Sequence, residues 1–229
     1  MQTIYFDNNA TTKVAEEVLE EMKPFFCELY GNPSSMHTFG GQIASALRHA
    51  REQVASLLGC DPAEIIFTSC GTESDNAAIK GRLAAVPDKR KVITSRVEHP
   101  AVLTVCRNLE NHGYNVVEIG VDRLGRLDID RLVDEIDDDT ALVTIMWANN
   151  ETGTLFPVPE IAELAARNGV AFHTDGVQAI GKIPFKLSET QIDMLSLSGH
   201  KLHAPKGVGA LYVRKGTRVS PFLLGGHQE

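Results

Sequence analysis

The sequence predicts an α/β domain built on a mostly parallel sheet. Short apolar runs alternate with segments that have the apolar spacing of helices, and this alternation is typical of parallel strands joined by helical crossovers. The run at 141–146 is nearly continuous in apolar residues, as expected for a central strand buried on both faces. The strand expected at 209–213 follows a short loop rich in glycine and proline. Because that loop is too short for a helical crossover, we expect this strand to pair antiparallel.

Each element is predicted from its own local pattern. Gly59 is suited to end the helix before it, and Pro100 after His99 opens another, since proline at the first helical position loses no useful N–H. Strands are expected at 64–69, 92–95, 116–119, 141–146, 170–173, 193–197 and 209–213. Helices are expected at 15–26 and 42–58, from about 73, from 99, from Asp128 or Asp130 to Ile136, and at 159–168.

The composition is that of an ordinary globular protein with an acidic balance. Of 229 residues, 43% are hydrophobic and 23% are charged, and the formal net charge is −8. An acidic balance without a long Lys/Arg cluster disfavours nucleic acid and anionic membranes as partners. No stretch reaches the ~18 apolar residues of a membrane span. The polar segment from Met1 to Lys13 lacks the features of a secretory signal.

The cysteines point to a reducing compartment. Cys27, Cys60, Cys70 and Cys106 are scattered without paired spacing, which suits neither a disulfide framework nor a metal knuckle. We therefore expect a soluble cytoplasmic enzyme or binding domain.

Polar residues directly follow most of the predicted strands. Because ligands of such sheets bind outside the carboxyl ends of the strands, these residues are expected to share one edge and to form a site. They are Gly71 and Thr72, then His99, then Asn149 and Asn150, then Asp175 and Gln178, and finally Ser198, Gly199, His200 and Lys201.

Several of these residues have both a simple and a chemical interpretation. Gly71 and Thr72 before a helix can hold a phosphate, although a strand-to-helix turn with a threonine cap is the commoner use. Lys201 is either a solvated surface lysine or an amine that forms a Schiff base with an aldehyde cofactor. Asp175 is either a helix cap or the carboxylate that keeps a pyridine nitrogen protonated.

The histidines also have two interpretations. His99 is a helix cap or core histidine, or else it stacks on a planar cofactor and moves protons. His200 and His203 have no third ligand in a fixed context, so no metal site is predicted. A phosphate cradle, a stacking histidine, a strand-end aspartate and a later lysine together fit pyridoxal 5′-phosphate best.

Seven motifs resemble those of the cysteine desulfurases, which belong to the class V aminotransferase superfamily, and the resemblance runs from residue 4 to the end. Two further segments, MWANN at 146–150 and GGHQE at 225–229, resemble the nitrogen-fixation (NifS) type more than the housekeeping type. The seven motifs are YFDNNATT (5–12), GNPSSMH (31–37), TSCGTES (68–74), EHPA (98–101), NNETG (149–153), HTDGVQ (173–178) and GHKLHAPKG (199–207).

The resemblance implies a fold and a reaction. The fold is the large domain of fold-type I pyridoxal-phosphate enzymes, with a mostly parallel sheet, helices on both faces and one antiparallel strand. The reaction removes sulfur from L-cysteine, leaves L-alanine, and passes the sulfur through an enzyme persulfide toward iron–sulfur cluster assembly.

The resemblance also implies a role for each site residue. Lys201 would hold the cofactor as a Schiff base, while His99 would stack on its ring and transfer protons. Asp175 would pair with the ring nitrogen. Asn150 and Gln178 would contact the phenolate or the substrate. The remaining cofactor-binding residues would be Gly71, Thr72, Ser198, Gly199 and His200, mostly at the phosphate.

One departure from the family concerns the nucleophile. The family's persulfide-forming cysteine, its substrate-carboxylate arginine and a threonine from the other subunit lie beyond the motif at 225–229, and none of the four cysteines matches the nucleophile's position. We therefore expect a truncated chain that is inactive by itself. Residues 1–14 would join a small C-terminal domain, and residues 15–229 would form the large cofactor domain.

Two alternatives to a desulfurase stay open. One is a non-catalytic module for pyridoxal-phosphate binding or dimerisation, and the other is a selenocysteine lyase or an aminotransferase-like enzyme. The combination of GHK and NNETG favours a desulfurase over an aminotransferase. The expected partners are L-cysteine, a second copy in a homodimer, and an iron–sulfur scaffold protein as sulfur acceptor.

Overall fold

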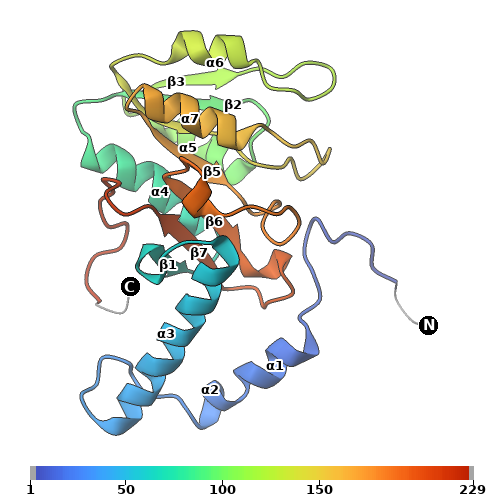
Figure 1. Ribbon diagram of the computed structural model, residues 1–229, viewed down its shortest axis with the longest axis vertical. Coiled ribbons are helices and arrows are strands. Elements are labelled where there is room, and N and C mark those ends of the chain that lie inside the picture. The colour runs from blue at the N-terminus through green and yellow to red at the C-terminus, as the bar shows by residue number, and fades with distance from the viewer. Residues whose placement is uncertain (1–3, 227–229) are drawn as a thin grey trace.

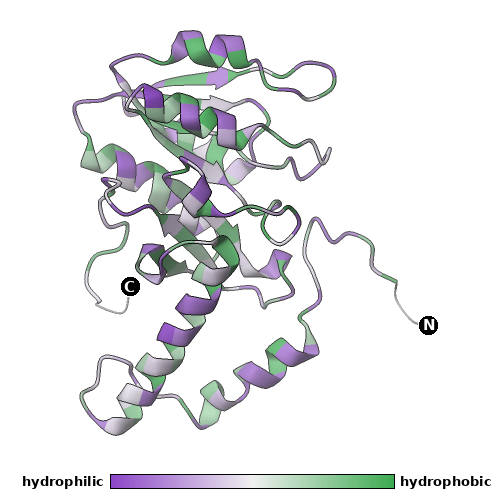
Figure 2. Cartoon of the chain, viewed as in Figure 1, coloured by the Kyte–Doolittle hydropathy of each residue, from purple (hydrophilic) through white to green (hydrophobic). Residues whose placement is uncertain are grey.

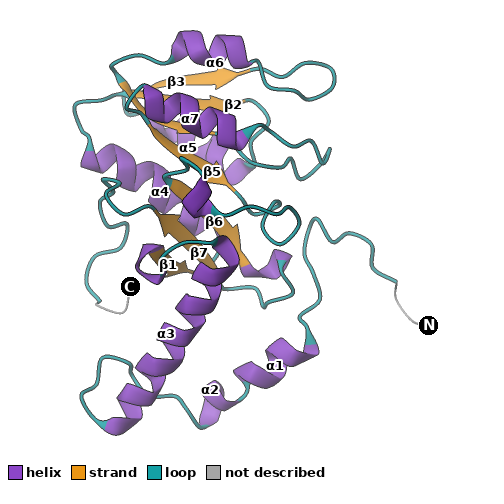
Figure 3. Cartoon of the chain, in the orientation of Figure 1, coloured by secondary structure: helices purple, strands orange, loops and turns teal. Residues whose placement is uncertain are grey.

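The computed structural model, which describes residues 4–226, is built around a seven-stranded sheet (Figures 1 and 3). The strands have short apolar sequences, and five of them are buried along most of their length because helices cover the sheet. In spatial order they are β1 (Ile65–Thr68), β7 (Gly209–Val213), β6 (Met194–Ser198), β5 (Ala171–Asp175), β4 (Thr140–Thr144), β2 (Lys91–Ser95) and β3 (Asn115–Ile119).

Strand β7 is the antiparallel member of the described sheet. It runs against β6 on one side and β1 on the other, whereas the pairs from β6 through β3 are parallel. The short connection from the 3₁₀ turn Gly199–Lys201 to β7 leaves no room for a crossover helix. The prediction of a mostly parallel sheet with one antiparallel strand at 209–213 is confirmed.

Helices cover both faces of the sheet, as predicted. Along β2, Val92 packs in the cluster that holds residues of α4 and α5, and the next residue, Ile93, packs in the cluster that holds residues of α6, α7 and the end of α3. This alternation follows from the two-residue period of a strand. The helices are α1 (Glu16–Met22), α2 (Pro24–Cys27), α3 (Thr38–Leu58), α4 (Gly71–Ala85), α5 (Pro100–Glu110), α6 (Ile129–Glu135) and α7 (Val158–Arg167).

The prediction of one helix over 15–26 is wrong. The segment forms α1 and α2 with Lys23 between them, because Pro24 has no N–H to continue the helical ladder. Helix α3 also begins earlier than predicted. The N–H of Gly40 donates to His37 Nδ1 at 3.1 Å, so that His37 caps a helix that starts at Thr38.

Helix α3 leads away from the sheet toward α1 and α2 (Figure 1). Its sheet-proximal end carries the buried residues Ala55 and Leu58, and alternating polar and apolar stretches mark the rest of its surface (Figure 2). Gly59 ends it in the left-handed conformation with φ 68°, which confirms the predicted C-cap.

Among the helices of residues 4–226, none combines the length and the apolar composition that a membrane span requires.

The N-terminal segment is bound to the 3₁₀ turn that follows β6. Both the N–H and the hydroxyl of Thr12 donate to the carbonyl of His200 at 2.9 Å, and the N–H of His203 donates back to Thr12 Oγ1 at 2.9 Å. These bonds bring residues 9–10 to the carboxyl edge of the sheet. Of the predicted segments, residues 1–3 of 1–14 and residues 227–229 of the 225–229 motif lie outside the described residues.

Candidate active site

A cavity of about 350 Å³ lies at the carboxyl ends of the parallel strands, where ligands of such sheets bind. Its walls come from the N-terminal segment, the start of α4, the segments after β2, β4 and β5, and the turn after β6. The lining residues are Asn9, Ala10, Cys70, Gly71, Thr72, Asp75, His99, Ala101, Met146, Ala148, Asn150, Asp175, Val177, Gln178, Ser198, His200 and Lys201.

With one exception, the structure brings the predicted cofactor-binding residues together in this wall. Gly199 does not line the cavity. Its N–H donates to the carbonyl of Val208 at 2.9 Å, and a Cβ at position 199 would lie 2.8 Å from Val208 Cγ1. Gly199 therefore allows close packing of the turn behind the site.

One end of the cavity is a backbone cradle at the start of α4. A Cβ on Gly71 would lie 2.8 Å from Val177 Cγ2 and 3.5 Å from the Cβ of Ser198. The first N–H groups of a helix have no intrahelical partner, and the helix dipole is positive at this end. Together with the hydroxyl of Thr72, this arrangement suits a phosphate.

His200 lies at the same edge. Its Nδ1 pairs with Thr11 Oγ1 at 3.0 Å, which fixes the ring against the N-terminal segment. Burial lowers the pKa of His200, and the positive charges of Lys201 and Lys206 lower it further.

The amine of Lys201 also meets the N-terminal segment. It donates to the backbone carbonyls of Asn9 and Ala10, the latter at 2.8 Å. Partial burial lowers the pKa of Lys201, and the nearby charge of Lys182 lowers it further. A lowered pKa favours the uncharged amine, which is the nucleophilic form of lysine.

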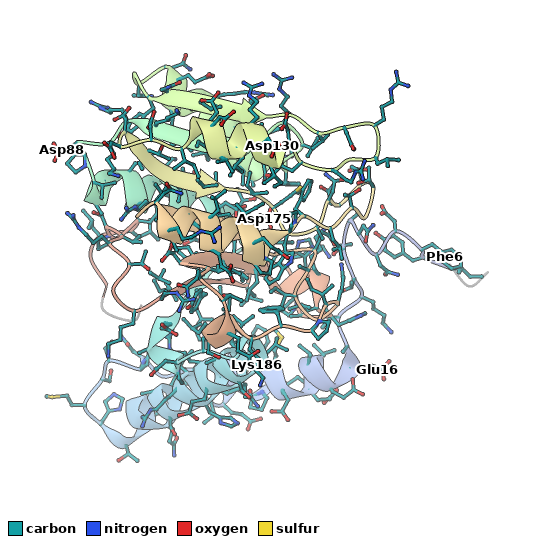
Figure 4. All side chains as sticks on the ribbon, turned by 45° about the horizontal axis from the view of Figure 1, so that its top comes forward. Phe6, Glu16, Asp88, Asp130, Asp175 and Lys186 are labelled. Atoms are coloured by element: carbon teal, nitrogen blue, oxygen red, sulfur yellow. The ribbon has the colours of Figure 1, made fainter. Side chains whose placement is uncertain are left out.

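Asp175 ends β5 inside the molecule (Figure 4). Its Oδ1 accepts a hydrogen bond from the N–H of Val177 at 2.9 Å. Burial raises the pKa of Asp175, whereas that hydrogen bond and the charges of His99 and Lys201 act in the opposite direction. Asp175 is thus a buried carboxyl that a positive partner would ionise.

His99 is both a helix cap and a cavity residue. Its Nδ1 accepts from the N–H of Ala101 at 3.1 Å, so that the neutral ring carries its proton on Nε2. The structure thus shows the helix cap and places the ring in the cavity wall.

Gln178 and Asn150 each share a hydrogen bond with Asn9. Gln178 Nε2 donates to the carbonyl of Asn9 at 2.8 Å, and its Oε1 accepts from Lys182 Nζ at 2.6 Å. The side chain of Asn9 donates to the carbonyl of Asn150 at 3.2 Å. Asn149, in contrast, turns away and accepts the N–H groups of Glu151 and Thr152 at 3.0 and 2.9 Å, which shapes the loop.

His200 and His203 each have a separate partner in the N-terminal segment. His203 has a φ of 60° and its Nδ1 pairs with the carbonyl of Lys13 at 3.0 Å. Within residues 4–226, no three His, Cys, Asp or Glu side chains are placed to share a metal ion.

Sequence reasoning missed three buried titratable residues near the cavity. Asp75 lines it, and His173 and Glu98 lie close behind, each at most 5% exposed. Asp75 has one available signal, because it follows Gly71 by four residues and so shares its helix face.

The aminotransferase class-V family model matches residues 4–229. The chain belongs to this family. It is 60% identical over 229 residues to a cysteine desulfurase of Trichormus azollae and 56% identical over 230 residues to the cysteine desulfurase NifS of Azotobacter vinelandii. Both matches include the whole of this chain, which spans 57% of the length of each of these curated relatives.

Solved structures agree with this fold. A "NIFS-LIKE PROTEIN" superposes with a TM-score of 0.96 at 45% identity, covering 99% of this chain and 63% of that one. "SspA in complex with cysteine" superposes with a TM-score of 0.95 at 41% identity, covering 99% and 66%. The predicted resemblance and fold class are confirmed.

Proposed function

We propose that this chain belongs to a pyridoxal-phosphate-dependent cysteine desulfurase, which takes sulfur from L-cysteine and leaves L-alanine. The observation that carries the proposal is the cavity itself, which joins an amine, a buried carboxyl, an imidazole and a backbone cradle. The similarity to known proteins supports L-cysteine as the substrate, because relatives at 54–60% identity are named cysteine desulfurases.

The residues present fit pyridoxal phosphate. Glycine at position 71 keeps the start of α4 free of a side chain where it lines the cavity, so that the first N–H groups of the helix can meet a phosphate. The buried carboxyl of Asp175 also lines the cavity and can meet a ring nitrogen there. When bound, this cofactor draws electrons from the α-carbon of an amino acid, and that is the chemistry desulfuration needs.

Each residue then has a task. Lys201 would attach the aldehyde through its amine, Asp175 would bind the ring nitrogen, and His99 would lie at the ring and move a proton at Nε2. Asn150 and Gln178 orient the phenolate or the substrate. The phosphate is bound by Gly71, Thr72, Ser198 and His200.

The thiolate that accepts the sulfur is proposed to come from outside residues 1–229. Cys27, Cys60 and Cys106 do not line the cavity, whereas Cys70 lines it from the phosphate cradle. The sulfur would remain as a persulfide on that cysteine and pass to an iron–sulfur scaffold protein, in nitrogen fixation or in housekeeping assembly.

The organisation of the whole protein is also proposed. Residues 1–14 join a small domain and 15–229 form the large domain. Supporting this, Ile4, Tyr5 and Phe6 are 75%, 48% and 87% exposed on a segment that extends from the body (Figure 1), and such side chains need a cover. Two copies form a homodimer in the cytoplasm, where the free thiols of the described cysteines stay reduced.

The first prediction tests this function in the full-length protein. Alanine release from L-cysteine is expected for the wild type and for Lys206→Ala, and is expected to vanish in Lys201→Ala. Borohydride reduction followed by peptide mapping should place the pyridoxyl group on Lys201. Label on Lys182 or Lys206 would contradict the assignment, and activity only with L-selenocysteine or a keto acid would favour another enzyme of the family.

A further inference from the structure

Asp75 is a buried carboxyl in the cavity wall without an assigned role. It lies on α4, is 1% exposed and lines the cavity. Its Oδ1 receives no hydrogen bond from any residue in the described part of the chain. A desolvated carboxylate with an oxygen that receives no hydrogen bond is costly, so a group in this position tends to stay neutral.

The imidazole beside Asp75 supplies no charge. His173 Nε2 lies 3.7 Å from Asp75 Oδ1. However, the two ring nitrogens pair with Thr144 Oγ1 at 2.8 Å and Ser196 Oγ at 2.9 Å, and complete burial lowers the pKa of His173 to about 3. The ring is therefore neutral at physiological pH.

The charged and titratable groups that face Asp75 are mostly acidic. They are Cys70 at the N-cap of α4, Asp175 and His173 on β5, and Glu98 before α5, together with the hydroxyl of Ser196 on β6. Burial raises the pKa of Asp75 well above its usual range. The charge of Asp175 raises it further, and the hydrogen bond from Ser196 only partly offsets this.

Asp175 differs from Asp75 in having what an anion needs. The N–H of Val177 donates to it at 2.9 Å, and the interactions with His99 and Lys201 lower its pKa. Two carboxyls that share one desolvated site do not both ionise. When the pair carries a single negative charge, that charge belongs on Asp175.

We propose that Asp75 is a positioning residue that stays the neutral acid behind Asp175 and so leaves Asp175 as the one carboxylate facing the ring nitrogen of the cofactor. The proposal rests on the proposed function of Asp175. A carboxylate at Asp75 would instead compete with Asp175 for the same proton, and the charge would no longer be fixed at the oxygens that face the ring.

Vibrational spectroscopy tests the protonation of Asp75 directly. Full-length protein labelled with ¹³C-aspartate is measured with and without pyridoxal phosphate, as wild type, Asp75→Asn and Glu98→Gln. The wild type should show the carbonyl stretch of a protonated aspartic acid in both states. The band should vanish in Asp75→Asn and persist in the matched control Glu98→Gln. No such band in the wild type, or its survival in Asp75→Asn, would overturn the proposal.

A second readout follows the ring nitrogen with ¹⁵N-labelled pyridoxal phosphate. Asp75→Asn, a neutral variant of the same shape, should keep the resonance of the protonated nitrogen, whereas Asp175→Asn should lose it. Loss in Asp75→Asn would show that Asp75 carries the charge, against the proposal. If the wild type binds no cofactor, the proposed function fails, and the acid band of the cofactor-free protein still decides the protonation of Asp75.

Discussion

At the scale of single residues, the proposed chemistry is carried by groups that also have ordinary structural contacts. His99 caps α5 through Nδ1, and Asp175 accepts the N–H of Val177. Local sequence therefore could not separate a cap from a proposed catalytic group, because each side chain makes a local backbone contact and also lines the cavity. Their shared location after parallel strands made the site predictable. Asp75 escaped prediction because it lies inside a helix, where an aspartate usually faces water.

The Asp175 carboxyl allows a direct prediction about cofactor binding. Removing one partner of a buried charged pair costs roughly 3–5 kcal/mol, so Asp175→Ala in the full-length protein should retain pyridoxal phosphate far more weakly. Equilibrium dialysis and visible absorbance measure this. Asp130→Ala on α6, which is not among the residues that line the cavity, is the control and should bind normally. Unchanged affinity in Asp175→Ala would reduce Asp175 to a structural cap.

Glu98 should make stability depend on pH. It accepts hydrogen bonds from Ser95 Oγ and the N–H of Met146, and burial raises its pKa from 4.5 to about 8. The folded protein therefore holds the proton of Glu98 more tightly than the unfolded chain does. The stability gained from this protonation is complete below the pKa of Glu98 in the unfolded chain, 4.5, and is lost as pH rises through about 8.

The comparison with Glu98→Gln isolates that contribution, since the amide does not titrate. Between the two pKa values, the unfolding free energy of the wild type should fall relative to the variant by up to about 1.4 kcal/mol per pH unit. Urea denaturation of both full-length proteins across this range measures the difference. Parallel pH profiles would contradict the raised pKa.

At the scale of elements, local signals predicted most helices and strands but not all of their ends. The apolar period marked 15–26 as helical, yet the period does not register that Pro24 removes an N–H, and two helices result. The strand at 209–213 and the cap at Gly59 were predictable because each depends on nearby residues. The short loop before the strand excludes a crossover helix, and glycine adopts the left-handed conformation that ends a helix. The start of α3 depends on His37, an uncommon cap residue that propensity does not indicate.

The first turn of α4 gives a prediction at this scale. In Gly71→Ala the new methyl would meet Val177 Cγ2 at 2.8 Å, and overpacking of this kind costs about 1–3 kcal/mol. Pyridoxal phosphate should bind correspondingly more weakly. Gly41→Ala on α3, where a Cβ meets nothing within 4 Å, is the matched control. Equal affinity of the two variants would show that the cradle does not bind the phosphate.

At the scale of the whole molecule, the strand order β1-β7-β6-β5-β4-β2-β3 was not predictable from local patterns. The first strand pairs with the last, so that Phe67 lies opposite Ala210, and nothing near either residue indicates this. The same holds for the N-terminal segment, since the contact between Asn9 and Lys201 joins residues far apart in the sequence. The motif at 5–12 was predicted to join a small domain, so the place of Asn9 and Ala10 in the cavity wall was not predicted.

The final prediction concerns which thiol accepts the sulfur. Burial raises the pKa of both Cys60 and Cys106 to about 12, so neither thiol supplies much thiolate at neutral pH. Cys27 is exposed but does not line the cavity. Cys70 lines the cavity, yet its carbonyl accepts the N–H of Ser74 in the first turn of α4, which fixes it at the phosphate end.

A thiolate must reach the substrate sulfur, and a cysteine fixed on a helix lacks the mobility for that step. The full-length protein with Cys27, Cys60, Cys70 and Cys106 replaced by alanine should therefore still release alanine from L-cysteine. Its rate is compared with that of the wild type after circular dichroism has shown that both are folded, and Lys201→Ala is the inactive reference. If the fourfold variant is inactive and restoring one cysteine brings the activity back, that cysteine is the nucleophile. The sulfur would then be accepted within residues 1–229, and the cavity would have to open toward that residue during each turnover.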